Sequence, residues 1–185
     1  MFSASPRLCV QFVVVNLAPN KLVNSWLKKL KLKMKIEEKL KALNLELPPA
    51  PPLGGVYKPV VIVGNMLYVS GQGPMQMDGS KIIGRVGDDM SLEDGYLAAK
   101  QVGLTMLSTI KSQIGDLDKI KRLVKTLGMV NCSPNFKSQP KVINGYSELM
   151  REVFGEDNGV GARSAVGMML PGGIAVEIEA IFELH

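Results

Sequence analysis

The stretch ARSAVGMMLPGGIAVEIEAIFEL, residues 162–184, decides the fold because it predicts two β-strands joined by a tight turn. Residues 163–170 and 174–184 follow an alternating strand pattern, and Pro171-Gly-Gly173 between them is a turn signal. The simplest register around this turn makes a hairpin in which position 163 opposes 181 and position 167 opposes 177. The chain is therefore expected to end in an antiparallel strand pair.

Three charged side chains of this hairpin are candidates for ligand binding. Alternation along the strands places Arg163, Glu177 and Glu179 on one face. The Cα rows of the arginine and the first glutamate should lie roughly 13 Å apart. The residues between them, Ala165 and Gly167, are small, so the hairpin leaves a gap for a small molecule. The alternative is an exposed ion pair on a solvated strand face, and the pattern alone leaves both interpretations open.

Upstream of the hairpin, strand patterns alternate with helix patterns. We expect strands at residues 56–63, 66–70, 82–86 and 123–130, with a hairpin turn between the first two. The order β-β-β-α-β-α-β-β predicts an α+β fold, a mixed sheet with both helices on one face. Several strands are apolar on both faces, so the face without helices should be covered by further subunits in a closed ring.

Capping residues mark the ends of the two helices. Ser91 and Asp94 form a Ser-x-x-Asp capping pair ahead of an apolar stripe, and Gly115 ends that helix. Pro140 begins the second helix, and Gly155 ends it.

Two segments beside the first strands also bear on function. Ser70-Gly71-Gln72-Gly73-Pro74 offers a hydroxyl and two glycines that let the backbone approach a ligand, and its alternative interpretation is a plain strand-ending turn. Tyr57 is interpreted by itself as half-buried packing, and the Pro-rich residues 47–53 as a stiff linker.

The distribution of charge divides the 185-residue chain near Met34. Residues 1–35 contain seven of the 22 basic residues and no acid, whereas the rest carries 15 basic and 17 acidic residues. The net charge of +5 is therefore no argument for nucleic-acid binding, and no nucleic-acid partner is expected. We expect residues 1–33 to be a dispensable basic leader and residues 34–185 to fold and assemble without it.

Three interpretations of the leader stay open. It is translated sequence upstream of a working start at Met34, a basic and acid-poor organelle-targeting sequence, or a secretory signal. We expect a cytoplasmic protein, or a mitochondrial one where the leader is a targeting sequence. No apolar run approaches the roughly 18 residues that a membrane-spanning helix needs, so no membrane partner is expected.

The inventory of side chains excludes most familiar active sites. The one histidine is the last residue, His185, which excludes a Ser-His-Asp triad, a Cys-His pair and a His-based metal site. No P-loop and no Cys-x-x-Cys pattern occurs. We expect no metal and no cofactor, and any chemistry must use carboxylates, arginine, hydroxyls and backbone groups.

Five short motifs follow one another along the chain: Gly-Val-Tyr57, Tyr68-Val-Ser70-Gly-Gln-Gly-Pro74, Ala162-Arg163-Ser164, Leu170-Pro171 and Val176-Glu177-Ile-Glu179-Ala180. In this order and at these spacings, they resemble the Rid/YjgF family of reactive imine and enamine deaminases, formerly the L-PSP endoribonuclease family. The resemblance covers about residues 36–184. Gly115-Asp-Leu-Asp118 and Gln139-Pro-Lys-Val142 are similar to one longer-chained subfamily.

The resemblance implies a chorismate-mutase-like fold and a homotrimer with ligand clefts between subunits. It implies hydrolysis of imines and enamines derived from amino acids, such as 2-aminoacrylate, to keto acids and ammonia. Arg163 matches the arginine that grips the substrate carboxylate, and Glu177 matches the acid that handles the attacking water. Ser70, Gly71 and Tyr57 match residues that line the cleft.

Two further lining positions are less regular. Ala165 stands where active members often have cysteine, and the asparagine of the second helix matches Asn144 or, because this helix is longer, Ser147. Two alternatives to the deaminase stay open. One is a trimer that binds small carboxylates, such as keto acids, without catalysis; the other is an endoribonuclease, against which the near-neutral body and the lack of an internal histidine argue.

Overall fold

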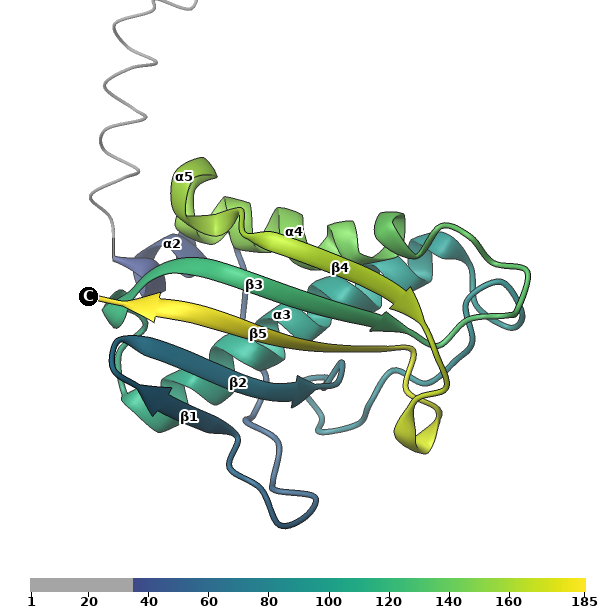
Figure 1. Ribbon diagram of the computed structural model, residues 1–185, viewed down its shortest axis with the longest axis horizontal. Coiled ribbons are helices and arrows are strands. Elements are labelled where there is room, and N and C mark those ends of the chain that lie inside the picture. The colour runs from purple at the N-terminus through teal and green to yellow at the C-terminus, as the bar shows by residue number, and fades with distance from the viewer. Residues whose placement is uncertain (1–34) are drawn as a thin grey trace, which may run out of the picture. The chain divides into compact units, whose positions relative to one another are not determined.

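A computed structural model describes residues 35–185, in which helices cover one face of a five-stranded sheet (Figure 1). In chain order the elements are α2 (Ile36–Ala42), β1 (Val60–Val63), β2 (Met66–Gln72), α3 (Leu92–Ile114), η1 (Leu117–Lys119), β3 (Ile120–Val130), α4 (Gln139–Phe154), α5 (Glu156–Gly159), β4 (Ala162–Gly167), η2 (Pro171–Gly173) and β5 (Val176–Leu184). The predicted α+β fold with a mixed sheet is confirmed. The predicted leader lies outside the described residues.

The sheet has the strand order β1-β2-β5-β3-β4. β3 and β4 are parallel, and the other neighbours are antiparallel. Along β5 the even-numbered residues from Val176 to Phe182 are buried, whereas the odd-numbered ones are more exposed. α3 and α4 lie behind the sheet in Figure 1, so the buried residues face these helices. We call the opposite side, which carries Glu177, Glu179 and Ile181, the uncovered face.

The predicted helix ends are confirmed. The Ser91 hydroxyl accepts a hydrogen bond from the Asp94 backbone N–H, and the Asp94 carboxylate accepts one from the Ser91 N–H, which completes a capping box. α3 ends at Gly115, which has a φ of 81° that glycine adopts without strain. α4 has Pro140 in its first turn and ends at Gly155.

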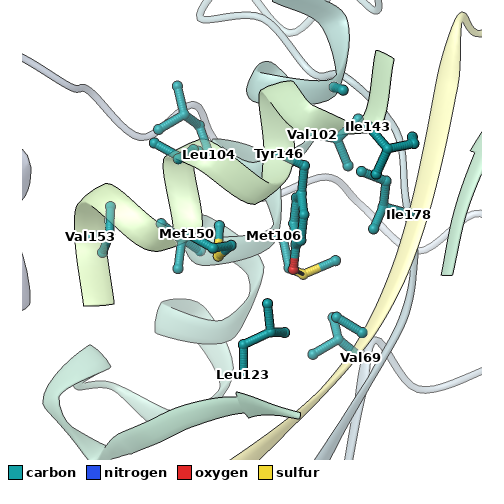
Figure 2. Packing of buried hydrophobic residues seen from close by; sticks show 14 of the residues in the cluster. Val69, Val102, Leu104, Met106, Leu123, Ile143, Tyr146, Met150, Val153 and Ile178 are labelled. Atoms are coloured by element: carbon teal, nitrogen blue, oxygen red, sulfur yellow. Dashed lines mark hydrogen bonds between the residues drawn. The ribbon is translucent and has the colours of Figure 1, made fainter. Parts of the chain in front are cut away.

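The core lies between the two helices and the sheet. Tyr146 of α4 is fully buried, and its hydroxyl contacts Met106 Sδ of α3 at 3.3 Å (Figure 2). Gly145 lets the helices come this close, because a Cβ at that position would overlap the backbone carbonyl of Tyr96. Ile178 and Phe182 close the core from the sheet side.

The predicted C-terminal hairpin is wrong. β4 and β5 do not pair, because β3 lies between them: Thr126 of β3 is opposite Arg163 of β4 on one side and Ala180 of β5 on the other. β3, α4 and β4 form a strand-helix-strand unit, and such a crossover joins parallel strands. The Pro171-Gly-Gly173 segment is one short turn of 3₁₀-helix within the connection from β4 to β5.

Two smaller predictions are also corrected. β1 begins at Val60 instead of residue 56. Residues 82–86 form no strand, because their backbone makes isolated bridges to three different segments: Ile83 bridges to Ile174, and Val86 bridges to both Met90 and Cys132. Gly84, at φ 156°, lies between the bridge of Ile83 and those of Val86. Isolated bridges to different partners do not form the continuous hydrogen-bonded ladder that defines a β-strand.

Candidate functional site

Glu177 lies on the uncovered face, beside an irregularity in β2. In the sheet, Glu177 of β5 is paired with Met129 of the neighbouring strand β3. The Glu177 carboxylate lies so close to Gly71 that a Cβ at residue 71 would overlap it. A side chain at residue 71 would force the carboxylate to move, so the glycine permits the close approach that the glycine-rich loop suggested.

The surroundings of Glu177 suit a group that exchanges protons. Its side chain is half-buried, and burial raises the pKa of its carboxyl from the ordinary value. The negative charge of Glu179 raises this pKa further, and the ammonium of Lys81 opposes the rise. A carboxyl with a raised pKa can both accept and donate a proton closer to neutral pH.

Tyr57 and Gly71 line one small cavity of about 110 Å³ together with Lys81. The Pro-rich segment, interpreted from the sequence as a linker, forms another wall of this cavity through Pro51, Pro52 and Leu53. It is fixed to α3, because the Ser108 hydroxyl donates a hydrogen bond to the Pro48 carbonyl at 2.6 Å. The segment is therefore part of the candidate site.

Ser70 lines a larger hollow of about 470 Å³ on the uncovered face. Its hydroxyl donates to the Lys58 carbonyl at 2.7 Å, so it tethers the chain before β1. Lys125 and Ser164 line the same hollow, and the lysine Nζ donates to the serine Oγ at 2.9 Å. Sequence reasoning missed both residues, although a lysine within the apolar run of β3 was an available signal.

Arg163 points to the other side of the sheet, toward α4. Its Nη1 donates to Asn144 Oδ1 and to Ser147 Oγ, each at 2.9 Å. Both candidates for the family's asparagine position therefore contact the arginine. Arg163 and Ser147 also line a cavity of about 140 Å³ with Thr126. Ala165 lies on the same side of β4, packed against the core.

The charge of Arg163 has no acidic partner within residues 35–185, where no carboxylate lies at ion-pair distance from it. Within the same residues, its Nε and Nη2 groups have no hydrogen-bond acceptor. Burial lowers the pKa of Arg163, but a guanidinium stays charged at neutral pH. The residue is thus a cation with two donors available for a ligand.

The predicted common face of Arg163 and Glu177 is wrong. Arg163 shares its side of the sheet with Thr126 and Ala180, which are buried against the helices. Glu177 and Glu179 do share a face, but it is the uncovered one. A single chain therefore holds two separate groups of candidate residues, one on each side of the sheet.

The family model described as "YjgF/chorismate_mutase-like, putative endoribonuclease" matches residues 37–170. The chain belongs to this family. It is 40% identical over 152 residues to Protein TCP17 of Trypanosoma cruzi, an alignment that covers 82% of this chain and 95% of the relative.

Solved structures agree with the family. The protein Atu1372 of Agrobacterium tumefaciens, of unknown function, is 40% identical with a TM-score of 0.74, and the match covers 88% of this chain and all of that one. A "putative endoribonuclease" of Shewanella oneidensis is 30% identical with a TM-score of 0.78, covering 82% of this chain and all of that one. The YjgF/chorismate-mutase-like fold is thereby confirmed.

Two further properties of this YjgF-family protein concern its described part only. Residues 35–185 contain no group of three acidic, cysteine or histidine side chains placed to hold a metal ion. Within the same range, no helix is both long enough and apolar enough to cross a membrane.

Proposed function

We propose that this protein hydrolyses imines and enamines derived from amino acids, of the 2-aminoacrylate type, to keto acids and ammonia. The observation that carries the proposal is the state of Arg163, a half-buried guanidinium held by two neutral side chains and lacking an acidic partner within residues 35–185. A buried charge of this kind is stabilised by an ionic ligand.

A carboxylate is the ligand that best fits Arg163. Asn144 and Ser147 both bind Nη1 and fix the plane of the guanidinium, which leaves Nε and Nη2 as a fork of two donors. Two parallel N–H···O bonds to a carboxylate use such a fork, and a lysine could not reproduce them. Every imine or enamine derived from an α-amino acid carries this carboxylate.

Glu177 supplies the proton transfers of the proposed reaction. An enamine first becomes the imine when a proton moves from its nitrogen to its terminal carbon. Water then adds to the C=N carbon while the carboxylate takes one of its protons, and this proton passes to the nitrogen. Collapse of the resulting aminoalcohol forms the C=O bond and releases ammonia. The raised pKa of Glu177 suits a group that alternates between base and acid. Such substrates also hydrolyse in water, so positioning supplies much of the required acceleration.

We further propose that the site is completed in a homotrimer, with Arg163 of one subunit facing Glu177 of the next. The uncovered face supports association, because it exposes large apolar side chains: Val61 is 43% exposed, Tyr68 42% and Val166 38%. Exposed apolar groups concentrated on one face are typical of protein interfaces. Association would also explain why the two groups of residues lie on opposite sides of one subunit.

A coupled assay tests the proposed activity. An amino-acid oxidase generates the imine in solution, and the formation of keto acid is followed with and without this protein. We expect a faster rate in its presence, in proportion to its concentration. A rate equal to that of spontaneous hydrolysis would contradict the deaminase.

A trimeric protein that binds small carboxylates without turnover is the second candidate, favoured by Ala165. This residue stands at the position of the family's frequent cysteine and packs against the core, where it offers no reactive group. Calorimetric titration of 2-oxobutyrate separates the two candidates. Binding without acceleration in the coupled assay would leave the binding protein as the function.

A further inference from the structure

A β-bulge lies directly beside Glu177. β2 and β5 are in register at Val69 and Ala180, and again at Gln72 and Ile178. Between these pairs β2 has two residues, Ser70 and Gly71, whereas β5 has only one. An extra residue of this kind bends its strand and is often found next to an active site. Here the bulge brings the Gly71 backbone against the Glu177 carboxylate.

Two buried side chains, Gln72 and Thr109, hold the bulge from the core side through successive hydrogen bonds. Gln72 Nε2 donates to the Ser70 carbonyl at 3.1 Å, within the bulge itself. Thr109 of α3 donates from its hydroxyl to Gln72 Oε1 at 2.8 Å. Gln72 is 4% exposed and Thr109 3%, so both side chains are buried beside the small cavity that Tyr57 and Gly71 also line. In such a buried chain the loss of one member leaves the next without a partner.

We propose that Gln72, oriented by Thr109, is a positioning residue for Glu177. It fixes the bulge so that the Gly71 backbone shields one side of the carboxylate from water, and its role is to act through Glu177. The inference rests on the proposed function, because it assigns a role in the same reaction. Under this proposal, the Thr109 side chain of α3 controls the hydration of the Glu177 carboxyl on the other side of the sheet.

The first variant is Thr109→Val, which keeps the shape of the side chain and removes its hydroxyl. Gln72 loses its hydrogen-bond donor and turns, and the bulge relaxes. We expect kcat to fall by about 10-fold or more while KM changes little, because a catalytic group is misplaced and substrate binding is not. Thr109→Ser restores the hydroxyl and should restore kcat.

The pH profile distinguishes positioning from mere stability. Burial is the main cause of the raised pKa of Glu177, so a relaxed bulge that admits water should lower this pKa. The acidic limb of kcat/KM should then move to lower pH in Thr109→Val. Titration of the Glu177 carboxyl by carbon NMR on the full chain measures the same shift without any turnover.

Two further variants test whether the effect comes from the hydrogen bonds of Gln72 or from a general loss of stability. Gln72→Met removes both hydrogen bonds and should reproduce the effect of Thr109→Val. Tyr96→Phe is the control, since the Tyr96 hydroxyl donates to Glu148 and joins α3 to α4 instead of α3 to the sheet. It should lower the melting temperature without moving the pKa of Glu177.

The possible results separate this inference from the proposed function. An unchanged Glu177 titration and unchanged kcat in a folded Thr109→Val variant would overturn the positioning role. No acceleration by the wild-type protein would overturn the deaminase, and the NMR titration would then still decide whether Thr109 and Gln72 control Glu177. A pKa that falls in Thr109→Val and recovers in Thr109→Ser supports the inference.

Discussion

The two sides of the sheet carry different parts of the candidate site. On the helix side, Arg163 is held by neutral hydrogen-bond partners from α4 and offers a fixed positive charge. On the uncovered face, Glu177 lies against the Gly71 backbone and has a carboxyl whose pKa is raised by burial. In the proposed function, one side holds an anion and the other moves a proton.

Because the sheet separates Arg163 from Glu177, the uncovered face carries only one half of the proposed site. Neither Arg163 nor Glu177 can act on a ligand bound by the other within one chain, because the sheet lies between them. A second copy that packs on the uncovered face would bring the two together. The proposed reaction therefore depends on assembly, and variants on the two sides should fail in different ways.

The largest effect is expected from breaking the assembly. Val166→Glu places a charge on the uncovered face, where the side chain is 38% exposed. A carboxylate buried in an interface costs several kcal/mol, on the order of 3–5 kcal/mol per unpaired charge, so the trimer should dissociate and turnover should vanish. Native mass spectrometry measures the change. Leu97→Glu, on an exposed position of α3, is the control that should stay trimeric. A wild-type monomer at micromolar concentration would contradict the proposed trimer.

The next largest effect is expected from Glu177→Gln. The amide keeps the shape of the side chain and cannot take a proton from water, so turnover in the coupled assay should fall on the order of 100-fold or more. Titration with 2-oxobutyrate should give nearly the wild-type affinity, because Arg163 is unchanged. Intact turnover in this variant would remove Glu177 from the mechanism and favour the binding protein.

Local signals predicted the helices well. Ser91 with Asp94, Gly115, Pro140 and Gly155 each act within a few residues of their own position, so their effect can be read without knowing the rest of the fold. Strand pairing is not local in this way. The predicted hairpin assumed that successive strands pair, whereas β3 inserts between β4 and β5. The strand-helix-strand order of β3, α4 and β4 was the signal for a parallel pair.

The sequence named candidate residues for the site, but it did not give their arrangement. The motifs identified Arg163, Glu177 and Gly71, and the structure gives each a defined environment. Their distribution over two faces depended on register, and a wrong strand order assigned Arg163 to the wrong face. The roles of Lys125 and of the Thr109 hydroxyl depend on contacts between distant elements, which no motif records.

An intermediate effect, confined to binding, is expected from Arg163→Lys. Lysine keeps the positive charge and loses the two-pronged geometry, so 2-oxobutyrate should bind more weakly by about 1–3 kcal/mol. Calorimetry on both proteins measures the difference. Arg122→Lys is the matched control, because Arg122 is an exposed arginine already paired with Glu183. Equal affinities in wild type and Arg163→Lys would show that Arg163 does not hold the ligand.

The smallest expected effect concerns stability, and its sign depends on pH. Because the pKa of Glu177 is raised from 4.5 in the folded protein, the protonated carboxyl favours folding at low pH. This contribution is complete below the unfolded pKa and is lost as pH rises through the folded pKa. At pH 7 the charged, half-buried carboxylate is therefore a burden, and Glu177→Gln should be slightly more stable than wild type, by less than about 1 kcal/mol.

Glu183, at the other end of β5, should contribute to stability with the opposite dependence on pH. Hydrogen bonds from Lys121 and Arg122 lower the pKa of its carboxyl, so Glu183 contributes stability above its unfolded pKa and loses it as pH falls through the lowered value. Glu183→Gln should thus be less stable than wild type at pH 7, and this difference should disappear in acid. Urea unfolding of both variants at pH 7 and at successively lower pH through the acid range, at one protein concentration, measures the two differences. Shifts of the same sign at pH 7 would mean that the Glu177 carboxyl is not desolvated, and the proton-transfer role assigned to the uncovered face would lose its electrostatic basis.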